Sequence, residues 1–297
     1  MTEELKTYRG NCHCAAYIYE VKLPEITSLT ECNCSMCYKR GGLWALPKPG
    51  NFRFVKGDPE TLTNYSFAQK SFSHKFCPNC GIQVLVVGFV EPPKPGEETE
   101  PLTGVNVRTF QHGQGVDVWT IEKTLLDGRS WPPAYKPPKF TGAEPKAEIE
   151  GGRLYTGSCH CGAVRIALKS KPLDKTFTDR ISECNCSICG RTGSVWIYPA
   201  KEQVVTEGEE NLAVYLSGTR LFGKSFCTTC GIQVHNLMQP VSEEDIENMP
   251  QGQADFIRSS FPIQPINLRV FNDVDVHDLN VQQFDGYNII EPRYVEP

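Results

Sequence analysis

The sequence predicts a mainly β protein made of two tandem modules, and three observations lead to that prediction. The 297 residues contain an internal repeat that covers nearly the whole chain, each copy holds seven of the 14 cysteines, and apolar and polar side chains alternate over several short stretches. Alternation with a period of two is typical of half-buried strands. The length also gives each copy enough chain to bury a core of its own.

Four pairs of matching segments define the repeat. In the first copy the segments read GNCHCAA, ECNCSMC, FCPNCGIQV and VNVRTF, and in the second GSCHCGA, ECNCSIC, FCTTCGIQV and INLRVF. Their offsets are 147, 152, 150 and 161 residues, so the order is the same and only the connecting loops differ in length. We therefore expect one fold to occur twice.

Proline and glycine indicate the boundary between the copies. Residues 127–152 contain WPP, KPP and a closing GG, a composition that favours an extended linker. We predict a first domain over residues 1–147, with the linker from about residue 128, and a second domain over 148–297. Each copy also has an irregular insert, at 91–104 and 239–265, which either lines a binding site or decorates the surface.

The alternation predicts strands at equivalent places in both copies. They are expected over 17–21 and 164–168, 82–87 and 232–237, and 105–110 and 266–271. Helical signals are few. Ser242 and the acidic residues that follow it predict the start of a short helix that reaches about Met249.

Charge and hydropathy disfavour several classes of function. The net charge is −5, with 17 basic and 17 acidic residues in the first 150 and 13 against 18 in the remainder. Neither half is broadly basic, so we expect no nucleic-acid partner. No apolar run approaches the roughly 18 residues of a membrane span, and the start MTEELKTYRG has no apolar signal core. We expect no membrane association and a location in the cytoplasm, or also in the nucleus.

The spacing of the cysteines favours a metal over disulfides. Each half has an odd number, in the runs C-x-C, C-x-C-x-x-C and C-x-x-C, in a chain without an export signal. Zinc is the expected metal, and an iron–sulfur cluster is the alternative. A C-x-x-C turn followed by glycine is a common zinc half-site, and the distant C-x-C pair can complete it. The resulting closed, structural sites contain Cys12, Cys14, Cys77 and Cys80, and Cys159, Cys161, Cys227 and Cys230.

Three cysteines remain in each copy. We call them the first trio, Cys32, Cys34 and Cys37, and the second trio, Cys184, Cys186 and Cys189. Three thiolates can hold one face of a tetrahedral zinc and leave the fourth position to water or substrate, as in a catalytic site. One Zn²⁺ and three thiolates sum to −1, which suits exchange of a soft ligand such as a substrate thiolate.

Other interpretations of the trios stay open. They could bind no metal, or a histidine could close them, for which His74 and His235 are the candidates. Lys224 stands in the second copy where His74 stands in the first, which argues against a shared histidine ligand.

Several residues near the cysteines have two readings. Lys39, Arg40 and Arg191 follow the trios, where they could offset charge or hold a substrate carboxylate, or could simply be solvated. The tryptophans seven residues after each trio, Trp44 and Trp196, belong to the core or to the wall of a pocket.

Two pairs of polar residues lie between ligand cysteines. His13 and His160 are expected to point away from the metal, because neighbours in an extended chain alternate sides. Asn33 and Asn185 are expected to form local hydrogen bonds within their loop.

Each copy resembles the glutathione-dependent formaldehyde-activating enzyme family, which also includes centromere protein V. The resembling motifs are G-[NS]-C-H-C, C-N-C-S-x-C and F-C-x-x-C-G, in that order. The resemblance implies a β-tent fold with two zinc ions per domain, four per chain. It also implies structural zinc at the four-cysteine sets and catalytic zinc at the two trios.

The resemblance further implies a reaction. The family's named reaction joins glutathione and formaldehyde into S-hydroxymethylglutathione, and the family is described as carbon–sulfur lyases. We therefore expect a zinc-dependent enzyme of this type that acts on a glutathione or other small-molecule thiol adduct, with the substrate thiolate at an open trio. The alternatives are a non-catalytic zinc-stabilised binding module, or one active domain beside one scaffold domain. Ala15 and Tyr38 replace glycines of the second copy, Gly162 and Gly190, so the second copy resembles the family more closely.

Overall fold

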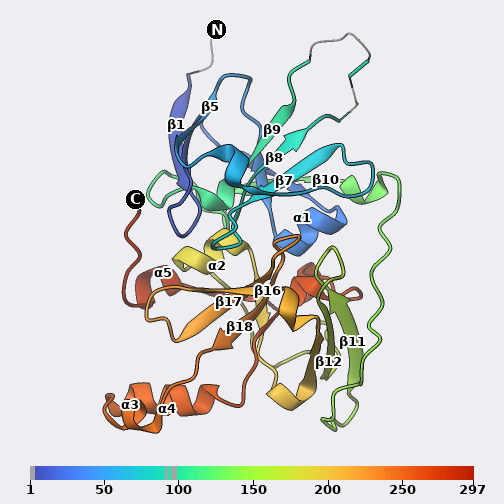
Figure 1. The fold of residues 1–297 in the computed structure, drawn as a ribbon, viewed down its shortest axis with the longest axis vertical. Helices are drawn as coiled ribbons and strands as arrows, with labels where there is room; N and C mark the ends of the chain where they lie inside the picture. Colours follow the sequence, from blue (N-terminus) through green and yellow to red (C-terminus); the bar gives the residue numbers. More distant parts are fainter. Residues whose placement is uncertain (1–3, 91–92, 95–98) are drawn as a thin grey trace.

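Two similar domains follow each other in the computed structural model, which describes residues 4–90, 93–94 and 99–297. Each contains a three-stranded sheet and a seven-stranded sheet. In Figure 1 the first domain, blue to green, lies above the second, olive green to red. The prediction of a mainly β chain with two tandem domains is thereby confirmed. None of the helices in the described part of the chain has the length and apolar character needed to cross a membrane.

The first domain forms its sheets in a non-sequential order. The strands of the smaller sheet, in order, are β1 (Lys6–Asn11), β2 (Ile18–Leu23) and β5 (Phe52–Lys56). The strands of the larger sheet, in order, are β10 (Glu122–Leu126), β3 (Ser28–Cys32), β4 (Leu43–Ala45), β9 (Leu102–Asn106), β8 (Gln83–Gly88), β7 (Phe72–Phe76) and β6 (Thr63–Tyr65). Strand β10 pairs with β3 in parallel, which brings residues after β10 next to the end of β3.

The second domain repeats this topology. Its smaller sheet contains β11 (Arg153–Ser158), β12 (Arg165–Ser170) and β15 (Val204–Glu207). Its larger sheet contains, in order, β16 (Leu212–Leu216), β17 (Phe222–Cys227), β18 (Gln233–Met238), β19 (Ile266–Asn267), β14 (Val195–Ile197), β13 (Ile181–Cys184) and β20 (Gln282–Phe284). Strand β20 is parallel to β13, as β10 is to β3.

The helices are short. The α-helices are α1 (Ser35–Arg40), α2 (Ser187–Thr192), α3 (Glu243–Glu247), α4 (Gln251–Ser260) and α5 (Gly286–Ile289). The 3-10 turns are η1 (Pro59–Thr61), η2 (Val107–Thr109), η3 (Gly128–Ser130), η4 (Lys201–Gln203), η5 (Glu209–Asn211), η6 (Leu268–Val270) and η7 (Val276–Asp278).

Most of the expected elements occur, with two differences. The strands expected over 105–110 and 266–271 end at Asn106 and Asn267. There the asparagine side chain accepts a hydrogen bond from the backbone N–H two residues later, 3.3 Å in both copies, and the chain turns into η2 or η6. The predicted helix begins after Ser242 as α3, but the insert also contains α4, which was not predicted. In the other insert, 91–104, residues 91–92 and 95–98 lie outside the described residues, and β9 begins at its end.

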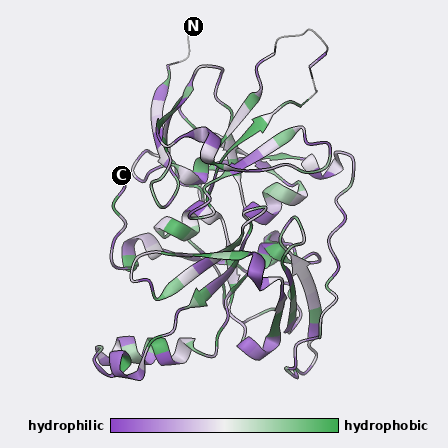
Figure 2. Cartoon of the chain, viewed as in Figure 1, coloured by the Kyte–Doolittle hydropathy of each residue, from purple (hydrophilic) through white to green (hydrophobic). Residues whose placement is uncertain are grey.

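The two domains meet through α1 and α2. Figure 2 shows hydrophobic residues in both helices, where the domains come together. Each helix packs into the core of the other domain: Met36 of α1 belongs to the second domain's cluster, and Ile188 of α2 to the first domain's. The ends of the helices lie back to back at Gly41 and Gly193, in left-handed conformations with φ of 58° and 60°. A Cβ on either glycine would lie 2.5 or 2.7 Å from the other's carbonyl oxygen, so the approach requires glycine.

The cations that follow the trios are part of this interface. The Nζ of Lys39 donates to the carbonyl oxygens of Ser158, at 3.1 Å, and Val270, at 2.7 Å. The side chain of Arg40 donates to the carbonyl of Cys230, and that of Arg191 to the carbonyl of Asn11. The reading of these cations as solvated is wrong, because all three side chains are buried between the domains.

Replacing Lys39 by Met should lower the free energy of unfolding by about 2 kcal/mol, because two buried carbonyls lose their donor. Chemical denaturation followed by circular dichroism would measure the loss. Lys22, which is exposed, provides the control: Lys22→Met should change stability by less than about 0.5 kcal/mol. Equal stability of the two variants would contradict the role given to Lys39.

Candidate metal centres

The structure brings all 14 cysteines into four clusters, two of four and two of three, in which the sulfur atoms lie within 4.8 Å of one another. In the first four-cysteine cluster the Sγ of Cys14 lies 3.6 Å from that of Cys12 and 3.5 Å from that of Cys77. The second has matching distances of 3.5 and 3.6 Å. Four sulfurs around a zinc at about 2.3 Å would be about 3.8 Å apart, so both clusters fit a tetrahedral zinc.

Local structure explains how the closed sites form. One pair of ligands, Cys12 and Cys14, follows β1, and the other, Cys77 and Cys80, lies in the turn between β7 and β8. The turn closes through the N–H of Gly81, which donates to the carbonyl of Cys77 at 2.9 Å. The backbone N–H of Tyr17 donates to the Sγ of Cys12 at 3.3 Å, which stabilises a thiolate. One ion would thus tie the start of each domain to a later hairpin.

Each trio lies where a strand of the larger sheet meets a short helix. In the first copy Cys32 ends β3, Cys34 caps α1 and Cys37 lies in its first turn. The N–H of Cys37 donates to the Sγ of Cys34 at 3.4 Å, and the N–H of Cys34 to the Sγ of Cys32 at 3.5 Å. The end of the strand and the first turn of the helix therefore bring three sulfur atoms together, and this arrangement fits one face of a tetrahedral metal site.

An asparagine between the first two cysteines of each trio holds a distant segment of the chain next to the sulfur atoms. The Nδ2 of Asn33 donates to Asp127 at 2.9 Å, and its Oδ1 accepts from the N–H of Arg129 at 2.9 Å. A Cβ on the intervening Gly128 would lie 2.6 Å from the Sγ of Cys32, so the backbone can pack this closely against the trio only at a glycine. The hydrogen bonds expected of Asn33 exist, but they reach a segment about 95 residues away and are not local.

The second copy has the same arrangement. The Nδ2 of Asn185 donates to Asp285 at 2.9 Å, and a Cβ on Gly286 would lie 2.5 Å from the Sγ of Cys184. These Asp-Gly pairs form a fifth repeated segment, at an offset of 158 residues, which the sequence analysis missed. Two residues are too short a match to notice without knowing that they meet the trios.

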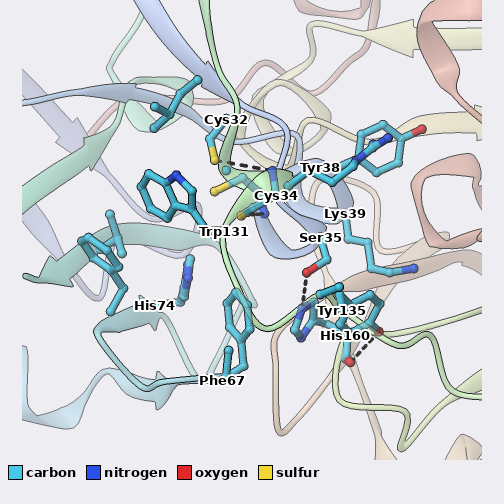
Figure 3. Close-up of a pocket in the computed structure, with 18 of the residues that line it drawn as sticks. Cys32, Cys34, Ser35, Tyr38, Lys39, Phe67, His74, Trp131, Tyr135 and His160 are labelled. Carbon is cyan, nitrogen blue, oxygen red and sulfur yellow. Dashed lines mark hydrogen bonds between the residues drawn. The ribbon is translucent and has the colours of Figure 1, made fainter. Parts of the chain in front are cut away.

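The histidines of the C-x-C pairs connect the two domains. The Nε2 of His160 lies 3.0 Å from the Oγ of Ser35 in α1 (Figure 3), and its Nδ1 lies 2.8 Å from the hydroxyl of Tyr65. His13 makes the reciprocal contacts, at 2.9 Å, with the hydroxyls of Ser187 and Tyr215. Burial lowers the pKa of both histidines to about 3, so both are neutral. With both ring nitrogens engaged across the interface, these histidines point away from the metal, as expected.

Histidine does not close the trios in the described part of the chain, where the groups able to hold a metal contain cysteine alone. The Nδ1 of His74 accepts a hydrogen bond of 2.9 Å from Gln83, and burial lowers its pKa to about 3. Both nitrogens of His235 bond hydroxyl groups, at 3.1 and 3.2 Å. Among the described residues, therefore, no histidine or carboxylate completes either trio.

Lys224 distinguishes the second trio from the first. Its side chain is 7% exposed, and its Nζ lies 4.4 Å from the centre of the Trp196 ring. Hydrogen bonds from Cys184 and Cys186 hold the pKa of Cys189 far below its usual range, and the charge of Lys224 acts in the same direction. Within the described residues this ammonium has no hydrogen bond and no ion pair. The second trio thus has a buried positive charge beside it where the first has neutral His74.

A cavity of about 1530 Å³ opens beside the first trio, between the domains. Figure 3 shows Phe67, His74, Trp131 and Tyr135 arranged around the space next to Cys34. Residues 131–138, within the segment predicted as a linker, form one wall, and His160 with residues 271–275 of the second domain forms another. Trp44 is both core and wall, because it is 5% exposed and lines the cavity.

The clusters predict about four zinc ions per chain, which mass spectrometry of the purified protein would count. Replacing Cys32, Cys34 and Cys37 together by serine should leave about three ions, while His74→Ala should leave four. A content of two in the unaltered protein, or of four in the triple variant, would contradict the assignment of metal to the trios.

Comparison with known proteins agrees with the repeat. Residues 7–116 and 154–259 each match the family of the glutathione-dependent formaldehyde-activating enzyme. A solved structure of a Rhodobacter sphaeroides protein is also similar, at 31% identity over 39% of this chain and 99% of that chain, with a TM-score of 0.32. Because the two matched regions span most of the chain, the protein belongs to the glutathione-dependent formaldehyde-activating enzyme family and contains two copies of its domain.

Proposed function

We propose that the protein is a zinc-dependent enzyme of the carbon–sulfur lyase type, which acts on a glutathione or other small-molecule thiol adduct. The first trio carries this proposal: three sulfurs within 4.8 Å of one another line a cavity that can admit a substrate. Three protein ligands with one free position are typical of a catalytic zinc, whereas four protein ligands are typical of a structural one. Family membership supports the same reaction class.

When bound, zinc supplies a Lewis acid that lowers the pKa of a thiol at the free position. The chain itself prepares that position. Peptide N–H groups donate to the sulfurs of Cys32 and Cys34 and stabilise their negative charge. The backbone at Gly128 packs against the Sγ of Cys32, and the buried ring of Trp44 keeps water from one side.

The proposed reaction needs no oxidant or reductant. In the bond-forming direction the thiol sulfur adds to the carbonyl carbon of an aldehyde, the C=O double bond becomes single, and the thiol proton ends on the carbonyl oxygen. The reverse reaction breaks the same carbon–sulfur bond and returns thiol and aldehyde. The residues of the site therefore have to lower the pKa of a thiol and orient its partner.

The second trio is the better equipped of the two to hold an anionic ligand. One Zn²⁺ and three thiolates sum to −1, and the buried Lys224 brings the total to zero. A fourth thiolate then lowers the total to −1. The first trio instead lies beside neutral His74 and near the buried Arg40, whose guanidinium already donates to the carbonyls of Gly81 and Cys230. Burial of uncompensated charge is costly, so thiolate binding should be tighter at the second trio.

Replacing all six trio cysteines by serine should abolish turnover of S-hydroxymethyl thiol adducts, measured as release of formaldehyde. Variants that lack one trio should each retain part of the activity. Protein folding in each variant is checked through the zinc that remains in the closed sites. Turnover that survives the loss of both trios would rule out the proposed function, and zinc would then be structural only.

Lys224→Met should weaken thiolate binding at the second trio about tenfold, because the compensating charge is lost. In these variants the first trio is also replaced by serine, so that only the second trio can bind thiolate. Cobalt is substituted for zinc, and the visible absorption of cobalt during a titration with 2-mercaptoethanol gives the affinity. Lys224→Arg keeps the charge and should bind nearly as tightly as the parent. Equal weakening in both variants would show that shape, and not charge, explains the role of Lys224.

A further inference from the structure

The cavity beside the first trio has apolar walls, which binding of the polar tripeptide glutathione does not require. Large apolar side chains line it and yet stay open to solvent: Leu46, Val90, Leu126 and Trp131 are between 40% and 63% exposed. The half-buried rings of Phe67 and Phe72 lie beside them. Exposed apolar side chains gathered around one cavity are typical of a site for an apolar ligand.

The charges in the cavity do not match glutathione, which carries two carboxylates and one ammonium. Lys39 lines the cavity, but two carbonyl oxygens of the second domain hold its Nζ. The other cations on the wall are Arg129 and Lys136. Three carboxylates, those of Asp273, Asp275 and Asp278, line the wall contributed by the second domain, so the cavity has no excess of positive charge for a dicarboxylate.

Part of the apolar wall is specific to the first copy. Positions that line the cavity as Leu46, Phe67 and Val86 are occupied in the second copy by Tyr198, Ser217 and Asn236. The cavity volume of about 1530 Å³ also exceeds the roughly 300–1,000 Å³ of most small-molecule sites. A substrate with a large organic group would fill it better than a small polar one.

We propose that the first centre takes thiol adducts whose organic group is large and apolar, such as an aromatic ring system, in preference to the glutathione adduct. This inference rests on the proposed function, because the trio at the base of the cavity is what would receive the sulfur. The apolar group would lie between Phe67, Trp131 and the wall from the second domain, so both domains contact the same substrate.

The test uses the full-length zinc-loaded chain with Cys184, Cys186 and Cys189 replaced by serine, so that the first centre alone binds sulfur. Calorimetry and quenching of tryptophan fluorescence measure the affinity for 2-naphthylmethanethiol and for glutathione. We expect the naphthyl thiol to bind at least tenfold more tightly. Glutathione binding as tightly or more tightly would overturn the proposal.

Substitutions that copy the second domain test the wall itself. Phe67→Ser and Val86→Asn should each weaken naphthyl thiol binding about fivefold or more and leave glutathione binding nearly unchanged. Ser217→Phe, at the equivalent position of the second copy, is the matched control and should leave both affinities unchanged. Should Phe67→Ser lose zinc or structure, Val86→Asn gives the result independently, and unchanged affinity for the naphthyl thiol there would overturn the proposal.

A sulfur-free probe separates this inference from the proposed function. 2-Methylnaphthalene should bind the chain with all six trio cysteines replaced, and Val86→Asn should weaken that binding. If it binds but no thiol adduct is turned over by the unaltered protein, the proposed reaction fails while the apolar selectivity stands. If thiol adducts are turned over with no preference for the naphthyl group, the reaction stands and the selectivity fails.

Discussion

The architecture depends on one close contact, the back-to-back approach of α1 and α2 at Gly41 and Gly193. This contact buries the helix of each trio in the other domain, with Met36 and Ile188 as the apolar anchors. As a result, each trio lies at the boundary between the domains. A cavity next to such a trio necessarily has walls from both copies.

The same contact couples the closed sites to the trios. His160 lies between two ligands of the second closed site, and its ring contacts Ser35, next to Cys34 of the first trio. His13 connects the first closed site to α2 in the same way. A metal bound in a closed site would therefore hold a histidine that contacts the helix of the opposite trio, so metal binding at the two kinds of site would not be independent.

The predictable parts of the site are those that the local chain determines. The division of cysteines into fours and threes follows from spacing, because C-x-C, C-x-x-C and the strand-to-helix turn at Cys32 to Cys37 act over a few residues. The parts that escaped prediction depend on contacts between distant segments. Lys39 looks like a solvated residue in sequence, and only the packing of two copies buries it. Asn33 likewise finds its partner, Asp127, only because β10 pairs with β3.

The reciprocal contacts have a further consequence for assembly. An interface in which each copy offers the same surface to the other is the geometry of a symmetric dimer, and a separate copy would have to find its partner by diffusion. The segment after β10 joins the partners in one chain, so their association is independent of protein concentration. The two halves of one chain can also change independently in sequence, which two identical chains of a dimer cannot do. Lys224, at the position in the second copy that His74 occupies in the first, is an example.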